Sequence, residues 1–266
     1  MKTTFSSAHR AAVGVAVVAA AVGAFYGAKA LVVGRLASAQ VSVIPFVVQR
    51  DIYFYGPGQT RRLAKIETIA RASDGTEVVA GTFGPVSAGL IARKITYPDS
   101  SVVGLIDAAR VKTTWPPSRR DAAFLKSQTL NPPPNCVRFS NMEALVSSHA
   151  AVLGHPADEI RHGALGAETL ITTWRARDLG CADLEYRAET RQADGSYKLT
   201  SFTQAVSLEI GEPSAGLLNP GTGYREVSPS EWEKAGMRIA GVTHYPTWQV
   251  KRWAQLDRQY DQAHGG

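Results

Sequence analysis

The sequence predicts a β-rich α+β protein that is exported, and three observations support this class. Turn signals recur about every 10 to 25 residues between β-branched and aromatic stretches, which is typical of an antiparallel meander. An apolar segment stands near the N terminus. The two cysteines both follow that segment. We therefore expect an apolar export helix, then a meander sheet that can curve and that helices cover.

The composition is that of a folded protein. The chain has 266 residues, of which 44% are hydrophobic and 20% are charged, so disorder is not expected. The net charge of +6 comes from single bases or pairs of bases interleaved with acids. No basic run interleaved with aromatic residues occurs, and the sequence therefore argues against nucleic-acid binding.

Residues 1–39 are predicted to be a signal peptide or a single N-terminal transmembrane anchor. The run Ala11–Ala28 has 18 residues without a charge, a length between a long signal-peptide core and a short membrane span. Small residues typical of cleavage sites follow at Ala28-Lys29-Ala30 and at Ala37-Ser38-Ala39. Both alternatives place the protein in a bacterial cell envelope. It is either anchored in the inner membrane and facing the periplasm, or periplasmic or secreted after cleavage.

Cys136 and Cys181 are predicted to form one disulfide. An even number of cysteines in an exported chain favours such a bond. Neither has a second cysteine within four residues, which argues against a zinc knuckle or a CxxC redox pair. Two unrelated buried thiols are the alternative.

Residues 40–245 are predicted to form the β-rich domain. The clearest hairpin is 61–83, which turns at Ser73-Asp74-Gly75, and a second hairpin spans 92–115 and turns at Pro98-Asp99-Ser100. A proline-rich connection at 116–135 follows, which predicts a loop or linker between two sheet segments, in one sheet or in two.

Helices are expected at three places beyond this connection. "SNMEALVSSHAAVLG" (140–154) has apolar residues near helical spacing and Ser140 as a candidate N-cap. Ser230-Glu231-Trp232-Glu233 can begin a short helix. Residues 246–266 read as an amphipathic helix with Trp253, Leu256, Tyr260 and Ala263 on one face. Strands, with a turn at 193–195, are expected after the first helix, and 211–232 is expected to be a turn-rich segment that covers the sheet edge.

Two segments of the second half resemble a pattern of poorly characterised bacterial cell-envelope proteins. Trp174 to Cys181 reads W-x-x-x-D-L-G-C, and a GEP at 211–213 precedes GY-x-E-x-SPSE at 223–231. The hairpin-rich layout is also similar to periplasmic LolA and RseB-like proteins. That resemblance implies a curved antiparallel sheet, covered by helices, that can shelter an acyl chain or a partner peptide.

Candidate chemistry is sparse. The densest group of titratable side chains lies at 149–162 and includes Asp158. Its candidates for metal ligands are His149, His155, Glu159 and His162, but their spacing matches no known ligand motif. No G-x-S-x-G, phosphate-binding loop or dinucleotide fingerprint occurs. No catalytic residue and no cofactor is therefore predicted.

Tryptophans are the best candidates for lining an apolar groove, because their large rings can pack against a ligand as well as in a core. The candidates are Trp115, Trp174, Trp248 and Trp253. The sequence favours a non-catalytic binding or accessory protein for an apolar ligand or an envelope partner. One alternative is an envelope hydrolase or metal-dependent enzyme that uses the cluster at 149–162. A structural subunit that docks through its C-terminal helix is a further alternative.

Overall fold

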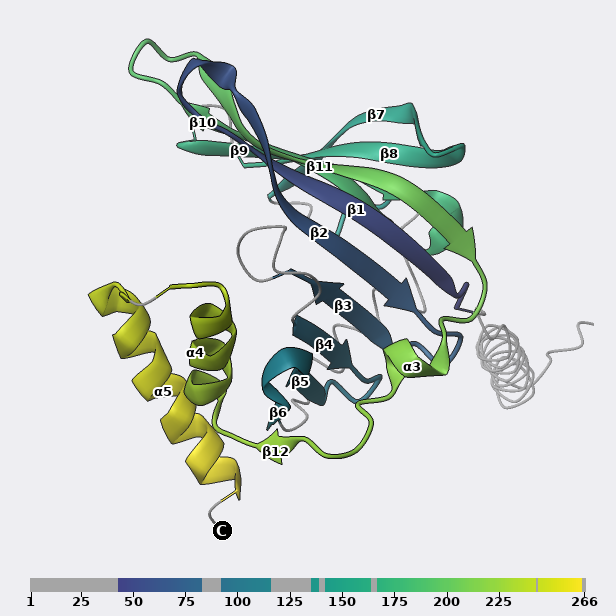
Figure 1. Ribbon diagram of the computed structural model, residues 1–266. Helices are drawn as coiled ribbons and strands as arrows, with labels where there is room; N and C mark the ends of the chain where they lie inside the picture. Colours follow the sequence, from purple (N-terminus) through teal and green to yellow (C-terminus); the bar gives the residue numbers. More distant parts are fainter. Residues whose placement is uncertain are drawn as a thin grey trace, which may run out of the picture. The chain divides into compact units, whose positions relative to one another are not determined.

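The computed structural model describes residues 43–82, 92–115, 135–138, 142–163, 167–242 and 244–264 (Figure 1). All of them belong to one unit, Ser42–Gly266. The predicted export segment at 1–39 and nearly all of the proline-rich connection at 116–135 lie outside the described residues. No helix of the described ranges is long and apolar enough to cross a membrane.

The described chain is β-rich, with few helices and one long, open sheet (Figure 1). The strands are β1 (Phe46–Tyr55), β2 (Arg61–Arg71), β3 (Glu77–Gly81), β4 (Ala92–Thr96), β5 (Val102–Ile106), β6 (Val111–Trp115), β7 (Glu143–Val152), β8 (His155–His162), β9 (Thr169–Ala176), β10 (Ala182–Arg191), β11 (Tyr197–Ile210) and β12 (Arg225–Glu226). Their order in the sheet is β12-β6-β5-β4-β3-β2-β1-β11-β10-β9-β8-β7.

This order consists of two meanders that share one sheet. Strands β1 to β6 form the first and β7 to β11 the second, and both are antiparallel throughout. The antiparallel pair β1 and β11 joins them, with Val48 opposite Leu208. The short strand β12 adds to β6 in parallel, with Arg225 opposite Val111. The described strands on either side of the proline-rich connection therefore form one sheet.

Three of the predicted hairpin turns are confirmed, and the same kind of hydrogen bond holds each of them. In each, an aspartate side chain accepts a hydrogen bond from the backbone N–H two residues later, which holds the turn closed. The Oδ1 atoms of Asp74, Asp99 and Asp194 accept at 2.8, 2.8 and 2.9 Å. The residue between donor and acceptor has positive φ each time, and at Gly75 and Gly195 the missing Cβ allows this freely.

The helix predicted for residues 140–154 is wrong. Glu143–Val152 is strand β7, which forms a hairpin with β8 through the two-residue turn Leu153-Gly154. Both turn residues have positive φ (50° and 85°), as the favoured two-residue hairpin turns require. Most of the apolar residues taken for a helical stripe do not line a core, since Met142, Leu145 and Val146 are 57%, 41% and 45% exposed; Val152 is the one that joins a core cluster. Pairing with β8 therefore outweighs the local helical pattern.

The helices are η1 (Pro57–Gln59), η3 (Asp107–Ala109), η4 (Arg177–Leu179), α3 (Ala215–Leu218), α4 (Pro229–Ile239) and α5 (Thr247–His264). Helix α4 begins where predicted, with Pro229 in its first turn and Ser228 as N-cap. It packs on β5 and β6, where Trp232 joins an apolar cluster with Ile106 and Val111.

Helix α5 forms a second helical layer over α4 and confirms the amphipathic C-terminal helix (Figure 1). Its inward face carries buried Gln249 and Trp253 and half-buried Leu256 and Tyr260, which recur at three- and four-residue spacing. Side-chain burial at Ala263 lies outside the described residues.

Candidate functional site

An open cavity of about 1190 Å³ lies against β1 and β2, close to where the two meanders meet. Its apolar lining includes Ile52 and Phe54 from β1, Leu63 from β2 and Tyr186 from β10. Ile52 and Phe54 share one face of β1 because side chains alternate along a strand. The β1–β2 register shifts between Ile52 and Tyr53, and such a bulge bends the strand locally.

Charged side chains also line this cavity. Glu67 forms ion pairs with Arg50 and with Lys65, the latter at 2.6 Å between Nζ and Oε1. Burial alone would raise the pKa of Glu67, but the charges of Arg50 and Lys65 outweigh burial and lower it. Arg62 adds a further exposed base. The lining therefore has three bases and one acid, an excess of positive charge.

Arg50 is the most deeply placed of these bases. It is 7% exposed, and its Nη1 donates to the backbone oxygen of Asp183 at 3.0 Å. Its buried Nε has no hydrogen-bond partner among the described residues. Burying an unsatisfied donor costs about 1–3 kcal/mol, which Arg50 bears beside its bonds to Glu67 and to the backbone of Asp183.

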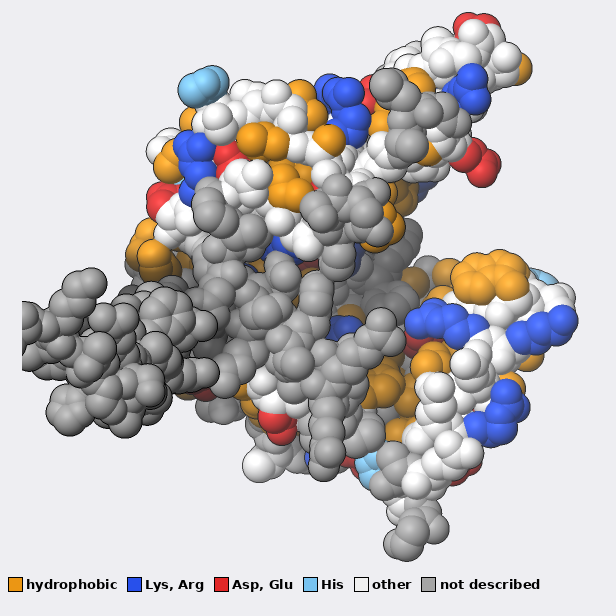
Figure 2. Space-filling model, turned by 180° about the vertical axis from the view of Figure 1, so that it is seen from behind, with side chains coloured by type: hydrophobic (Ala, Val, Ile, Leu, Met, Phe, Trp, Pro, Cys, Tyr) orange, Lys and Arg blue, Asp and Glu red, His pale blue; other side chains and the backbone are white. Residues whose placement is uncertain are grey.

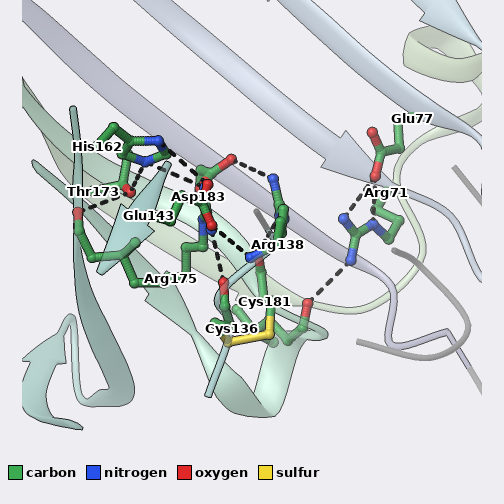
Figure 3. A network of polar contacts seen from close by, with 12 residues as sticks. Arg71, Glu77, Cys136, Arg138, Glu143, His162, Thr173, Arg175, Cys181 and Asp183 are labelled. Atoms are coloured by element: carbon green, nitrogen blue, oxygen red, sulfur yellow. Dashed lines mark hydrogen bonds and ion pairs between the residues drawn. A yellow bond between two sulfur atoms is a disulfide. The ribbon is translucent and has the colours of Figure 1, made fainter. Parts of the chain in front are cut away.

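A second candidate is the buried polar network centred on Arg175 of β9 (Figure 3). Two of its N–H groups donate to Glu143, at 3.0 and 2.8 Å, and its Nε donates to Asp183 at 2.7 Å. The backbone oxygen of Cys136 accepts a further bond from Arg175 at 2.7 Å. One guanidinium thus ties β7, β9, β10 and the segment 135–138 together.

Arg138 supplies the second base of this network (Figure 3). Its backbone N–H donates to Glu143, while its side chain donates to Asp183 at 3.1 Å and to the backbone oxygen of Cys181 at 2.6 Å. Burial opposes ionisation of Asp183, but the charges of Arg138 and Arg175 outweigh it, so its pKa is lowered. The two bases and the two acids balance in charge.

The predicted disulfide lies beside the network and is confirmed. Cys136 and Cys181 are bonded, with their Cα atoms 5.2 Å apart, and both are buried with Ile160 (Figure 3). Each cysteine's backbone oxygen accepts a bond from one arginine of the network, as described above. The disulfide and the network therefore together fix the position of the segment 135–138.

One group of side chains has the order of groups found in a catalytic triad: the hydroxyl of Thr173, the imidazole of His162 and the carboxylate of Glu143. His162 Nε2 is 2.9 Å from Thr173 Oγ1, and His162 Nδ1 is 3.3 Å from Glu143 Oε1. However, Arg175 holds both oxygens of Glu143, and Thr173 is buried and hydrogen-bonded to the backbone oxygen of Ile160 at 3.4 Å. A nucleophile must reach its substrate, so this geometry supports a packing role.

The predicted metal candidates do not converge. His155 and His162 stand at the two ends of β8, about 23 Å apart along an extended strand of this length. His155 Nδ1 instead lies 2.8 Å from Asp178 Oδ2. Glu159 lies between them on β8 and so shares no helix face with His162, while His149 lies on β7. Within the described ranges, no group of three or more His, Cys, Asp or Glu side chains could hold a metal ion.

None of the four candidate tryptophans is among the residues that line the cavity. Trp115 packs edge-on against Trp232, with ring centroids 5.9 Å apart. Trp253 is buried between the helices, and Trp174 packs against the core near Arg187. Trp248 is 64% exposed on α5. A ligand-lining role for these four stays a prediction.

The sequence analysis missed the charged side chains that line the cavity, but a signal for them exists. Arg50 stands two positions from both Val48 and Ile52, so period-two alternation places a charge on an apolar strand face. Lys65 and Glu67 interrupt the apolar pattern of β2 in the same way. Charges at inward positions of two neighbouring strands predict a buried ion pair or a polar site.

No family model matches the chain, and no curated protein matches its sequence. Among solved structures, PNGF-II is similar over 74% of this chain, with 13% identity and a TM-score of 0.44, and this chain spans only 33% of its length. A LolA superfamily protein from Nitrosomonas europaea is similar over 66% of this chain and 90% of its own length, with 9% identity and a TM-score of 0.30.

Proposed function

We propose that this chain is a non-catalytic binding protein that holds an amphiphile in the cavity against β1 and β2. The observation that carries the proposal is the combination of volume and lining. A cavity of about 1190 Å³ is somewhat larger than most small-molecule sites, so it has room for a long alkyl chain. Ile52, Phe54 and Leu63 offer an apolar surface for an alkyl chain, and burying each methylene of that chain contributes about 0.8 kcal/mol.

The charged side chains select the polar end of that amphiphile. Lys65 and Arg62 leave the lining positive after Glu67 has been paired with Arg50. An anionic group gains charge-assisted hydrogen bonds here, whereas a neutral hydroxyl gains weaker ones. The favoured ligand therefore has a long alkyl chain that ends in a carboxylate or phosphate.

Export to a bacterial cell envelope is part of the proposal. The disulfide between Cys136 and Cys181 supports it, because such bonds persist mainly in oxidising compartments. Residues 1–39 would act as the export signal or as the anchor. The mass of the protein recovered from the envelope fraction distinguishes cleavage after Ala30 or Ala39 from retention. A reduced chain recovered from the cytosol would refute the export proposal.

Native mass spectrometry of the full-length protein tests binding, with palmitate and hexadecanol as separate probes. We expect one palmitate per chain and at least about tenfold weaker retention of the alcohol, the difference that charge-assisted bonds contribute. Ala64→Trp places a large ring in part of the cavity and should weaken retention, and so should Phe54→Ser at an exposed position. The matched control Ala193→Trp changes an exposed turn and should retain palmitate.

Two outcomes would refute the proposal. One is the absence of palmitate from the wild-type protein. The other is equal retention by the wild type, Ala64→Trp and Phe54→Ser, each shown to be folded by near-ultraviolet circular dichroism.

A further inference from the structure

The connection between α4 and α5 exposes an apolar patch, which we call the hairpin tip. It consists of Ile239 at the end of α4, Val242 in the connection and Trp248 in the first turn of α5. They are 38%, 40% and 64% exposed. They lie at one end of the helical pair because residues 240–246 join the helices there. Figure 2 shows hydrophobic side chains at this end of the pair, with Lys and Arg side chains on both sides.

The hairpin tip is not needed for packing within the chain. The inward face of α5 is made by Gln249 and Trp253, which are both buried. Trp253 donates through Nε1 to Glu233 at 2.6 Å and packs edge-on against Tyr245, with centroids 4.8 Å apart. Trp248 lies on another side of the helix, so its large apolar surface faces solvent in the described structure. An exposed tryptophan among bases points to a partner outside this chain.

The stretch of sequence that contains the hairpin tip is basic. From Lys234 to Leu256 the sequence contains four bases and no acid. Three of these bases are exposed: Arg238, Lys251 and Arg252. The nearest acid in sequence, Glu233, is already occupied by Arg252 at 3.1 Å and by the indole of Trp253. A second copy of the same tip would be repelled, so the complementary partner is anionic.

We propose that the hairpin tip binds the surface of a membrane that contains anionic lipid. Tryptophan favours the headgroup level of a bilayer because its ring is apolar and its N–H is polar. Bases beside it gain about 1 kcal/mol each near an anionic surface. Trp248 inserts at the headgroups while Arg238, Lys251 and Arg252 contact lipid phosphates. The proposal does not depend on what fills the cavity on the sheet.

Quenching by brominated lipid tests this contact in the full-length chain. The probes are vesicles of brominated phosphatidylcholine, alone or mixed with brominated phosphatidylglycerol. We expect quenching with the phosphatidylglycerol vesicles, and loss of the larger part of it in Trp248→Phe. Because quenching acts only at short range, this readout reports the tip even if residues 1–39 also bind lipid.

Charge-reversal variants distinguish binding through the hairpin tip from a general electrostatic attraction of the protein to the vesicle. Lys251→Glu/Arg252→Glu should weaken the Trp248-dependent quenching by at least about tenfold, because two bases are lost and two acids are added. Arg191→Glu/Arg258→Glu makes the same charge change at exposed positions away from the tip and should have a small effect. Equal quenching of wild type and Trp248→Phe would overturn the proposal. So would equal binding by the two charge variants, or a concentration-dependent dimer that Trp248→Phe dissolves.

Discussion

Glu143 on β7 and Arg175 on β9 form a doubly hydrogen-bonded ion pair, although β8 lies between their strands. Their side chains are 0% and 3% exposed. A pair that bridges a strand fixes the position of three strands at once. A buried pair need not stabilise more than apolar residues would, but breaking it leaves a charge in a medium of low dielectric constant.

Glu143→Gln should therefore lower the free energy of unfolding by about 3 kcal/mol, because Arg175 loses one of its two counterions. Urea denaturation monitored by circular dichroism measures this loss. The matched control Glu168→Gln, at an exposed position, should change it by less than about 0.5 kcal/mol. Equal effects of the two substitutions would contradict the role assigned to the pair.

His162 should make stability depend on pH below neutrality. Burial, mainly, lowers its pKa from the ordinary 6.5, with Glu143 opposing and Arg175 reinforcing the shift. The unfolded chain then takes up a proton before the folded chain does. Stability is therefore complete above about pH 6.5 and falls as the pH drops from there towards the folded-state pKa.

Urea midpoints at pH 7.5 and 5.5 measure this dependence. The wild type should have the lower midpoint at pH 5.5. His162→Gln should reduce the difference between the two pH values, since glutamine does not titrate. A variant whose midpoint changes with pH as much as that of the wild type would argue against His162 as the source.

The disulfide should contribute about 4 kcal/mol, the value that the chain-entropy model gives for a closed loop of 45 residues. Cys136→Ser/Cys181→Ser should lower the free energy of unfolding by this order. Reducing the wild type with dithiothreitol should give a similar loss, whereas the double variant should not respond to the reductant. A response of the double variant would assign the loss to something other than this bond.

Gly104 of β5 should not tolerate a side chain. A Cβ there would lie 2.9 Å from the ring of Trp115 and 3.0 Å from that of Trp232. Gly104→Ala should therefore destabilise by about 1–3 kcal/mol through overpacking between the sheet and α4. Gly216→Ala in α3 meets nothing within 4 Å and should be neutral or mildly stabilising. Thermal unfolding of the two variants side by side makes the comparison.

Local chemistry predicts part of this fold. The turns at Asp74-Gly75 and Asp194-Gly195 and the stripe of Trp253, Leu256 and Tyr260 on α5 arise from neighbouring residues, so the sequence alone predicts them. The pairing of β1 with β11 depends on residues far apart in the chain, and no local pattern indicates it. The prediction for residues 143–152 failed for a different reason. The spacing of their apolar residues is close to that of a helix, although the segment forms a strand.

The candidate sites follow the same rule. Cys136 and Cys181 could be paired because the chain has only two cysteines. In the cavity, Arg50 and Glu67 lie on the adjacent strands β1 and β2, but Tyr186 lies on β10, which comes near them only when β11 pairs with β1. The sequence can show that a single charged residue stands at an inward position of a strand. It cannot show that such residues lie close together, because that depends on how the strands are arranged in the sheet.

The junction of β1 with β11 also has a consequence during biosynthesis. Val48 pairs with Leu208, which is synthesised about 160 residues later. At common elongation rates Leu208 therefore leaves the ribosome roughly ten to thirty seconds after Val48. Throughout that interval β1 has an open edge of unpaired backbone groups, with Val48 and Ile52 on it. The nascent chain is therefore most prone to aggregate before its final hairpin is made. Chaperone dependence should fall sharply once residue 210 has emerged.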